Sequence, residues 1–422
     1  MSKTATDTLG QAIEAANDEV FQRLVKGDPV LVDVAPAGEV IPGLEDRMIL
    51  HAGPPVEWDR TCGALRGGAM CIALFEGWAE TPAQAADMLA KGAIKLEPNH
   101  HHQAVGPMAG VTSRSLPVYV VENRAYGNRA AARLAEWMSQ FGDYSPEAVD
   151  VLRRWRDLFA PAIREAIRSL GGVELKPIIA KALQMGDELH NRPVAGSSVL
   201  GNALAPGLIQ AGVPMDKLVP TLYYLGRNEF LFLPVVMASA KSVADPARDV
   251  EHSTVVTAMA RNGTEFGIRV SGLGDTWFTA PAVRLVNGVY LDGHTAEDAG
   301  TDMGDSTITE TVGLGAFTLA GAPAILSLTG GTPEEALQYS RDMYQITVGT
   351  HPDYRIPALR FQGCPVGIDI RKVVETGIVP ILDTAISHKE PGHPTIGGTL
   401  VRPPIEAFEK ALAAFEGKYG IA

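Results

Sequence analysis

The sequence predicts an α+β protein of several domains, in which two α/β domains flank a mainly helical middle domain. Near the N-terminus, a helix-like periodicity is followed at once by a short buried strand. From about residue 146 strand signals nearly vanish, and from about residue 253 short apolar runs punctuated by glycine return. The predicted domains are residues 1–145, 146–245 and 246–422, since 422 residues suffice for two or three domains.

The first domain alternates helices and strands. Apolar residues recur at helical spacing through the first 26 residues, and the dipeptide Thr81-Pro82 is typical of a helix start. The expected elements, in order, are a helix at 8–26, a strand at 29–34, a turn around Gly63, Gly67 and Gly68, a helix at 81–91, and strands at 93–96 and 118–121.

Long helical periodicities dominate the middle domain. One of these helices places His190 at its end, beside Asn191 and Arg192. Two interpretations stay open there. Either Glu188 and Arg192 form an ordinary surface pair worth about 0.3–0.5 kcal/mol, with His190 packed on the apolar face, or the segment from Gly186 to Arg192 is the polar rim of a site. The expected helices are at 146–169, 176–191 and 216–225.

The third domain combines strands with glycine-rich loops. No charge occurs from Thr311 to Pro333, but glycine and proline interrupt this stretch. We therefore expect a buried helix followed by a buried strand rather than a membrane span. Ser306, with Thr309 and Glu310 after it, is expected to cap a helix. The expected strands of this domain are at 253–259, 267–270 and 324–328.

Charge and cysteine content narrow the possible function classes. The net charge of −13 disfavours broad contact with nucleic acid or an anionic membrane, so a small anion would need a dedicated arginine site. Cys62, Cys71 and Cys364 form no C-x-x-C pair, and the first residues lack the apolar core of a signal peptide. We expect a cytoplasmic enzyme that contacts neither nucleic acid nor membrane.

Three consecutive histidines, His100, His101 and His102, lie in a loop between two strand-like segments. Loops held by ordered elements often carry catalytic groups, and imidazole titrates near neutral pH. Because adjacent side chains point in different directions, at most one or two of them face a common site, and the third is a solvent or packing residue. All three are candidate catalytic residues. A single protonating imidazole is favoured over a metal centre, and neither a metal nor a cofactor is expected.

Several arginines stand beside glycines or amides, where guanidinium and backbone N–H groups can converge on an anion. For Arg60 and Arg66 the alternative is pairing with Glu57 and Asp59. The glycine spacing around them matches neither a P-loop nor a dinucleotide-binding fingerprint. The candidate anion-binding residues are Arg60, Arg66, Asn191, Arg192, Arg261, Asn262, Arg269 and Arg371.

Many short blocks in order, over nearly the whole chain, resemble the YahG/YlbE-like family, which includes a subunit of oxamate carbamoyltransferase. The resemblance implies phosphorolysis of N-carbamoyl-oxamate (oxalurate) to oxamate and carbamoyl phosphate, a late step of allantoin degradation, together with an FdrA-like partner subunit. The blocks are HAGPP (51–55), NHHH (99–102), AVGPMAG (104–110), MGDE (185–188), HNR (190–192), RNEF (227–230), MARNG (259–263), GIRVSG (267–272), GDS (304–306), GID (367–369) and RKV (371–373).

This chemistry ranks the candidate residues, because phosphate and the oxamate carboxylate are both anionic and the intermediate develops an oxyanion. We expect Arg261 and Arg269 to hold one anion, and Arg60, Arg66 or Arg192 to hold another. His101 or His102 is expected to protonate the leaving nitrogen. A homo-oligomer is expected. The alternatives are a non-catalytic scaffold for the FdrA-like partner, and a carbamoyltransferase or hydrolase acting on another ureido compound.

Overall fold

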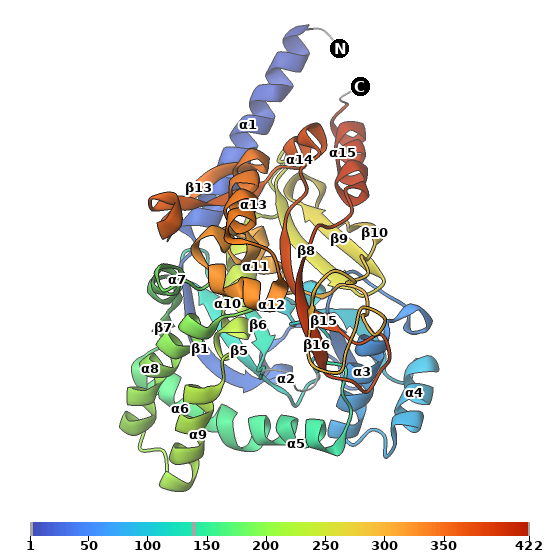
Figure 1. Ribbon diagram of the computed structural model, residues 1–422, viewed down its shortest axis with the longest axis vertical. Helices are drawn as coiled ribbons and strands as arrows, with labels where there is room; N and C mark the ends of the chain where they lie inside the picture. Colours follow the sequence, from blue (N-terminus) through green and yellow to red (C-terminus); the bar gives the residue numbers. More distant parts are fainter. Residues whose placement is uncertain (1–2, 137–140, 421–422) are drawn as a thin grey trace.

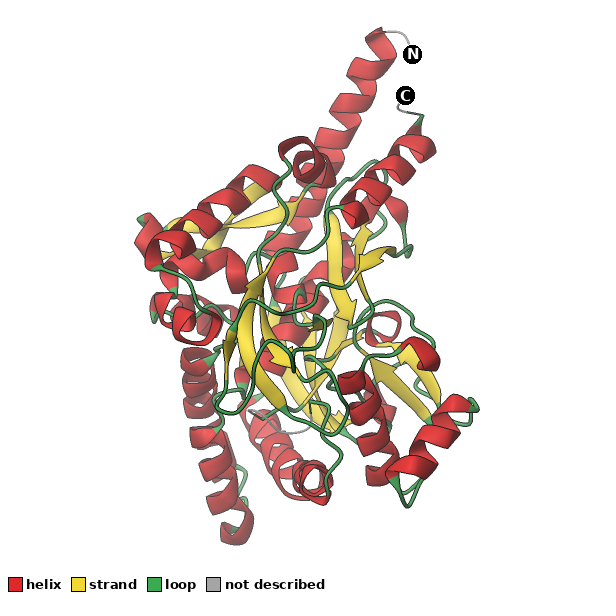
Figure 2. Cartoon of the chain, turned by 45° about the vertical axis from the view of Figure 1, so that its right-hand side comes forward, coloured by secondary structure: helices red, strands yellow, loops and turns green. Residues whose placement is uncertain are grey.

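The computed structural model describes residues 3–136 and 141–420 and confirms the α+β fold class (Figure 1). Helix α1 (Lys3–Lys26) projects from one end of the molecule, near the last helix, α15 (Glu406–Tyr419) (Figure 1). Strands run through the middle of the molecule, and helices surround them and fill the opposite end (Figure 2). The domain boundaries near residues 145 and 245 stay a prediction.

A five-stranded sheet with the order β4-β6-β5-β1-β7 forms the core of the N-terminal half. The predicted strands at 29–34 and 118–121 are its antiparallel neighbours β1 (Pro29–Pro36) and β5 (Pro117–Asn123). The apolar helix α10 (Phe232–Ala244) is buried along its whole length and packs against β5 and β6. The remaining strands are β4 (Ala104–Val105), β6 (Asn128–Arg133) and β7 (Val173–Glu174).

A separate parallel pair, β2 (Met48–His51) and β3 (Lys95–Pro98), positions the histidine loop. Carboxyl ends of parallel strands meet at one edge, so His51 lies opposite Pro98, and a 3-10 turn, Asn99–His102, follows directly. The predicted helix at 81–91 is α4 (Pro82–Ala90). Its first turn is capped by Thr81, whose hydroxyl accepts the Gln84 N–H at 3.2 Å.

The turn predicted around Gly63, Gly67 and Gly68 is wrong, because these residues begin helix α3 (Gly63–Phe75). Close packing explains the glycines. A Cβ on Gly67 would stand 1.8 Å from the carbonyl oxygen of Gly142, and one on Gly68 would stand 2.5 Å from that of Ala109. The glycines therefore let other backbone segments approach a helix.

Helices dominate residues 146–245, as predicted. The expected helix at 176–191 is wrong beyond Gln184, because Gly186 (φ 84°) and Leu189 (φ 67°) take left-handed conformations and turn the chain into a loop. His190 therefore lies in this loop rather than at a helix end. The helices here are α5 (Pro146–Arg154), a π-helical segment (Trp155–Phe159), α6 (Ala160–Leu170), α7 (Leu175–Gln184), α8 (Val194–Gln210), α9 (Met215–Arg227) and α10.

No single helix within residues 3–136 and 141–420 is both long and apolar enough to cross a membrane. One pair, Met215–Arg227 and Phe232–Ala247, meets the length and composition only when taken together, across a bend of 74°.

Two small sheets in the C-terminal half confirm the strands predicted at 253–259 and 267–270. The first contains β8 (Val256–Asn262), β9 (Glu265–Val270), β10 (Phe278–Pro281) and β12 (Met303–Gly304), and the second contains β11 (Val289–Tyr290), β15 (Leu382–Ser387) and β16 (Thr395–Val401). A hairpin of β13 (Thr347–Ile356) and β14 (Gln362–Ile368) lies beside helices α13 (Pro333–Ile346) and α14 (Ile370–Thr376).

Two predictions for this half are wrong. The segment 324–328 is not a strand, because a 3-10 turn (Pro323–Ile325) and the short helix α12 (Leu326–Thr329) occupy it. Ser306 caps no helix, because helix α11 (Ile308–Thr311) begins after Thr307 and neither side chain supplies a cap hydrogen bond. Burial was predicted correctly for residues 311–319 but not for 324–328, where Ala324 and Ser327 are exposed. The apolar, glycine-rich composition also did not distinguish a strand from tight helical turns.

Candidate functional site

A hollow of about 230 Å³ opens beside the histidine loop, and we call it the arginine pocket. Its lining comes from separate parts of the chain: the turn after β3, the segment after α10, strand β9 and the loop that follows β9. The lining residues are His100, His101, Arg248, Arg269 and Asp275.

His100 and His101 reach the pocket in different ways. His100 is fully buried, and its ring lies edge-on to Trp277 with the centroids 5.5 Å apart. Neither of its ring nitrogens has a hydrogen-bond partner, although Nε2 lies 3.6 Å from Oδ1 of Asp305. His101 is exposed, and its Nε2 accepts the Trp277 indole N–H at 3.1 Å, so the proton of the neutral ring sits on Nδ1.

His102 does not take part in this arrangement. Its Nδ1 contacts the carbonyl oxygen of Pro42 at 2.8 Å, on the side of the turn that faces residues 42–45. The turn therefore directs two imidazoles into the arginine pocket and one away from it, which matches the expectation that at most two share a site.

The two arginines of the pocket have unused donors. The Arg269 guanidinium stacks over Trp277 at 4.7 Å from the ring centroid, and its Nη1 lies 3.4 Å from Asp275. Arg248 also contacts the Asp275 carboxylate. The Nε atoms of both arginines are buried without a hydrogen-bond partner. A buried donor without an acceptor is costly, so these N–H groups indicate the place of an anionic ligand.

Burial, assisted by the positive charges around the pocket, keeps the histidines neutral. Burial, and then the charges of Lys241 and Arg269, lower the pKa of His100 well below its ordinary value. Partial burial, followed by the charge of Arg269, lowers the pKa of His101 to about 4. Lys241 is itself buried, with its ammonium 2.6 Å from Asp245. At neutral pH the pocket therefore holds cationic arginines beside uncharged imidazoles.

Asp305 ties together the loops that carry the histidines. Its Oδ1 accepts the Gly53 N–H at 2.8 Å, and its Oδ2 accepts the Gly106 N–H at 2.9 Å and Nδ2 of Asn99 at 3.0 Å. Burial raises the pKa of Asp305 to about 7. The turn at Gly53 (φ 85°) admits no side chain, because a Cβ there would stand 2.4 Å from the backbone of Arg261.

Arg261 and Asn262 serve the structure rather than the pocket. All five N–H donors of the buried Arg261 are used: two on the Asp302 carboxylate, two on Gly304 O and Thr307 Oγ1, and one on Thr384 Oγ1, all within 2.8–3.1 Å. Asn262 donates to Pro54 O and accepts the backbone N–H groups of the turn that follows it. Neither residue has a free group for a ligand.

The remaining predicted arginines, Arg60, Arg66, Arg192 and Arg371, also lie outside the pocket. Arg60 is exposed, 3.6 Å from Glu265. Arg66 donates to Thr61 and to the backbone carbonyls of Trp58 and Asp59, rather than to the Asp59 carboxylate. Arg371 binds Asp369 and Glu14. Of the arginines predicted from the sequence, Arg269 alone lines the pocket.

Sequence reasoning missed Arg248, Asp275 and Lys241. No local motif marks them. Arg248 follows Asp245-Pro-Ala in a 3-10 turn, and Lys241 lies within the apolar helix α10. A lysine inside an otherwise apolar helical stretch was the one available signal, since buried lysines need a special environment.

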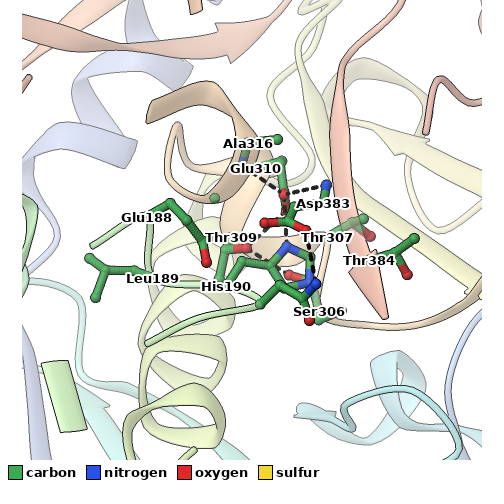
Figure 3. Close-up of polar contacts among 12 residues, drawn as sticks. Glu188, Leu189, His190, Ser306, Thr307, Thr309, Glu310, Ala316, Asp383 and Thr384 are labelled. Carbon is green, nitrogen blue, oxygen red and sulfur yellow. Dashed lines mark hydrogen bonds and ion pairs between the residues drawn. The ribbon is translucent and has the colours of Figure 1, made fainter. Parts of the chain in front are cut away.

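A second polar cluster surrounds His190 in the core (Figure 3). His190 Nδ1 lies 2.7 Å from Oε1 of Glu310, which also accepts the backbone N–H of Ala316 at 3.0 Å. Asn191 Nδ2 donates to Oδ1 of Asp383 at 3.0 Å. Although burial favours protonated Glu310, the charge and hydrogen bond of His190 hold its pKa below the ordinary value. Of the two open interpretations of this segment, the surface-pair interpretation is wrong, because Glu188 is buried and accepts only the Arg192 backbone N–H, and His190 bonds to a carboxylate. The polar-rim interpretation stays a prediction.

Metal binding finds no support in the ranges that the structure describes, where no group of three or more His, Cys, Asp or Glu residues has a suitable arrangement. The thiols are equally unpromising, because burial raises the pKa of Cys62, Cys71 and Cys364. The chemistry available is that of arginine, histidine and carboxyl groups.

The fold and this pocket define a class, an α+β protein with a half-open, arginine-lined pocket suited to small anions. A family profile described as "Oxamate carbamoyltransferase subunit AllG" matches residues 94–306. The chain is 40% identical over 416 residues to the oxamate carbamoyltransferase subunit AllG of Escherichia coli (strain K12), covering 97% of this chain and 99% of that protein. The chain therefore belongs to the AllG family.

Two further proteins are similar over most of their length. The chain is 42% identical over 424 residues to the E. coli protein named "Uncharacterized protein YahG", covering 100% of this chain and 90% of that protein. A crystal structure of a conserved protein of unknown function from Enterococcus faecalis V583 superposes with a TM-score of 0.94. It is 44% identical in sequence and covers 97% of this chain and 99% of that one.

Proposed function

We propose that this chain is the subunit of an oxamate carbamoyltransferase that binds the phosphate end of carbamoyl phosphate, and that it does so in the arginine pocket. The single observation that carries the proposal is the pair of buried, unpartnered Nε donors of Arg248 and Arg269 at one small hollow. Phosphate oxygens are the acceptors that match guanidinium groups best. The name of the E. coli relative supplies the reaction class.

In the proposed transfer, carbamoyl phosphate is the carbamoyl donor and oxamate is the acceptor. The amide nitrogen of oxamate attacks the carbonyl carbon of carbamoyl phosphate, a C–N bond forms, and the C–O bond to phosphorus breaks, so that phosphate leaves with the electron pair. The nitrogen loses one proton. Phosphorolysis of N-carbamoyl-oxamate is the reverse of these steps. Arginines stabilise the oxyanion and the departing phosphate in both directions.

His101 serves as the proton acceptor in the transfer direction. Its pKa of about 4 in the empty pocket leaves the ring unprotonated at neutral pH, so we no longer assign it the role of general acid in the free protein. A bound phosphate offsets the charge of Arg269, which raises the pKa of His101 and lets it take the proton. The substrate N–H must first replace the Trp277 N–H at Nε2.

The test measures binding of inorganic phosphate and carbamoyl phosphate to the full chain by calorimetry. Arg269→Met and Arg248→Met should each weaken binding at least about tenfold, because each removes a charge-assisted hydrogen bond. Arg60→Met, an exposed arginine outside the pocket, is the matched control and should change nothing. Equal affinities for all four proteins would overturn the proposal.

The partner subunit is tested by turnover. The proposal expects carbamoyl transfer from carbamoyl phosphate to oxamate when the chain is combined with an FdrA-like partner, and the same arginine variants should reduce it. If the arginine variants lost phosphate binding but the complex kept normal turnover, the result would favour a scaffold role for this chain. Transfer to other amides but not to oxamate would favour another ureido compound. A homo-oligomer remains part of the proposal, and light scattering measures it.

A further inference from the structure

The cluster around His190 contains two carboxyl oxygens whose acceptor capacity is unused. Oε2 of Glu188 and Oδ2 of Asp383 are buried and have no hydrogen-bond partner. Their side chains are otherwise anchored, because Oε1 of Glu188 accepts the Arg192 N–H at 2.6 Å and Oδ1 of Asp383 accepts Nδ2 of Asn191 at 3.0 Å. One oxygen of each group is therefore fixed in place, and the other is left open.

The other acidic groups nearby are already satisfied. Both oxygens of Asp187 accept backbone N–H groups, from Leu189 and Gly196 at 2.8 Å. Both oxygens of Glu310 are bonded, Oε1 by His190 and Oε2 by the Thr309 hydroxyl at 2.9 Å. The unused capacity is thus confined to Glu188 and Asp383, so it is not a general property of a crowded acidic region.

Charge balance leaves room for a donor. His190 Nδ1 already contacts Glu310, and the charged neighbours of Glu188 are carboxylates: Asp383, Asp187 and Glu310. Burial, and then the charge of Asp383, raise the pKa of Glu188, and burial raises that of Asp383. A donor group from outside the chain would relieve both the repulsion and the missing hydrogen bonds.

The backbone between Glu188 and His190 takes an unfavourable conformation. Leu189, between Glu188 and His190, has a φ of 67°, which costs a leucine about 1–2 kcal/mol. The conformation turns the carboxylate and the imidazole toward the short helix α11 and strand β15 from one loop (Figure 3). Such local strain is typically found where side chains must be positioned for a ligand.

We propose that Glu188 and Asp383 form a binding site for a small ligand that presents N–H donors, either ammonium or a primary carboxamide. The two open oxygens accept two N–H groups of one nitrogen. This second site complements the arginine pocket, whose open groups are donors. The carboxamide form of the proposal rests on the proposed function, because oxamate and carbamoyl phosphate each carry an –NH₂ group, whereas the ammonium form stands without it.

Two isosteric variants test the site. Glu188→Gln keeps the acceptor for the Arg192 N–H and adds its own N–H donors where the open oxygen was, and Asp383→Asn keeps an acceptor for Asn191. Either variant should abolish ligand binding without unfolding the chain, which circular dichroism checks. Glu390→Gln, an exposed carboxylate, controls for the loss of one charge.

The first arm uses ammonium chloride against sodium chloride at equal ionic strength, with the melting temperature of the full chain as readout. The second arm compares binding of oxamate with that of oxalate, which has a carboxylate oxygen in place of the –NH₂ group. An ammonium-specific rise in melting temperature that both variants abolish supports the ammonium form. An oxamate preference of about tenfold, lost in both variants, supports the carboxamide form.

The proposal is overturned if wild type and both variants respond alike in both arms. This failure can be told apart from failure of the proposed function. Arg269→Met should weaken binding of inorganic phosphate if the arginine pocket is the phosphate site, and it should leave the ammonium response intact. Unchanged phosphate binding in Arg269→Met, together with an intact ammonium response, would reject the proposed function and keep this site.

Discussion

Side chains of the same type have different roles at and around the arginine pocket, even where they are adjacent in sequence. His101 accepts the Trp277 N–H and lines the pocket, whereas His102 binds the carbonyl oxygen of Pro42 on the other side of the turn. The same contrast separates Arg269, with a free Nε, from Arg261, which has none. A residue type alone therefore does not assign a role, because the role depends on which donors are left unused.

His101→Gln should lower turnover of the assembled enzyme by about a hundredfold, within the usual range for groups that transfer a proton. His102→Gln, the neighbouring control, should leave turnover within about twofold, because this ring faces away from the pocket. Steady-state rates of carbamoyl transfer measure both. If His102→Gln were the more damaging change, the assignment of the proton acceptor would be wrong.

Asp275 is the internal competitor of an anionic ligand. Its exposed carboxylate contacts Arg248 and lies 3.4 Å from Arg269, so an entering phosphate must displace it. Asp275→Asn should therefore strengthen phosphate binding by up to about fivefold, since exposed ion pairs contribute at most about 1 kcal/mol. Calorimetry measures the change. Weaker binding in this variant would instead mean that Asp275 holds the arginines in position.

At the scale of single elements, the sequence predicted those whose pattern is local. The strand at 29–34 and the capped helix at 81–91 are present, because alternation of burial and a Thr-Pro start are short-range signals. The glycines of α3 led to the wrong prediction of a turn, because they permit close contacts with residues 109 and 142, which are distant in sequence. The helix expected to reach Asn191 ends at Gln184, because the loop after it takes left-handed conformations.

Gly67→Ala tests whether close backbone approach explains the glycines of α3. The new methyl group would overlap the carbonyl oxygen of Gly142, so the free energy of unfolding should fall by about 1–3 kcal/mol, as in overpacked cores. Gly417→Ala is the matched control, because this exposed glycine lies in helix α15 with open space around it, and it should stabilise the chain by about 0.5–1 kcal/mol. Urea unfolding measures both, and equal effects would contradict the explanation.

For the molecule as a whole, burial of histidines and burial of Asp305 have opposite effects on how stability depends on pH. The buried histidines have lowered pKa values, so their contribution to stability is present above pH 6.5 and is lost as the pH falls. Asp305 has a raised pKa, so its contribution is present at low pH and is lost as the pH rises through about 7. The arrangement makes stability and ligand binding depend on the same buried groups.

The contribution of a single buried histidine to the pH dependence of stability can be measured at His51. It is fully buried, donates from Nδ1 to the carbonyl oxygen of Ala52, and burial lowers its pKa to about 4. As the pH falls from 6.5 to 4, wild type should lose up to about 3 kcal/mol through this group. His51→Asn should start less stable at pH 7 and approach wild type at pH 4. Urea unfolding at several pH values measures this, and a constant gap would contradict it.

Local pattern was enough to predict the fold class and many of the strands and helices. It also led to the hypothesis that arginine and histidine in glycine-rich loops bind a small anion, which stays a prediction. Short-range periodicity and charge encode these features directly. Which residues line the pocket could not be predicted in the same way. His100, Arg248, Arg269 and Asp275 come together only when segments that are distant in sequence pack against one another. In the packed structure every N–H donor of Arg261 has an acceptor, whereas the Nε donor of Arg269 has none. One carboxyl oxygen each of Glu188 and Asp383 also has no hydrogen-bond partner. Which polar groups remain unpaired after burial is a property of the tertiary structure, and those groups define the candidate sites.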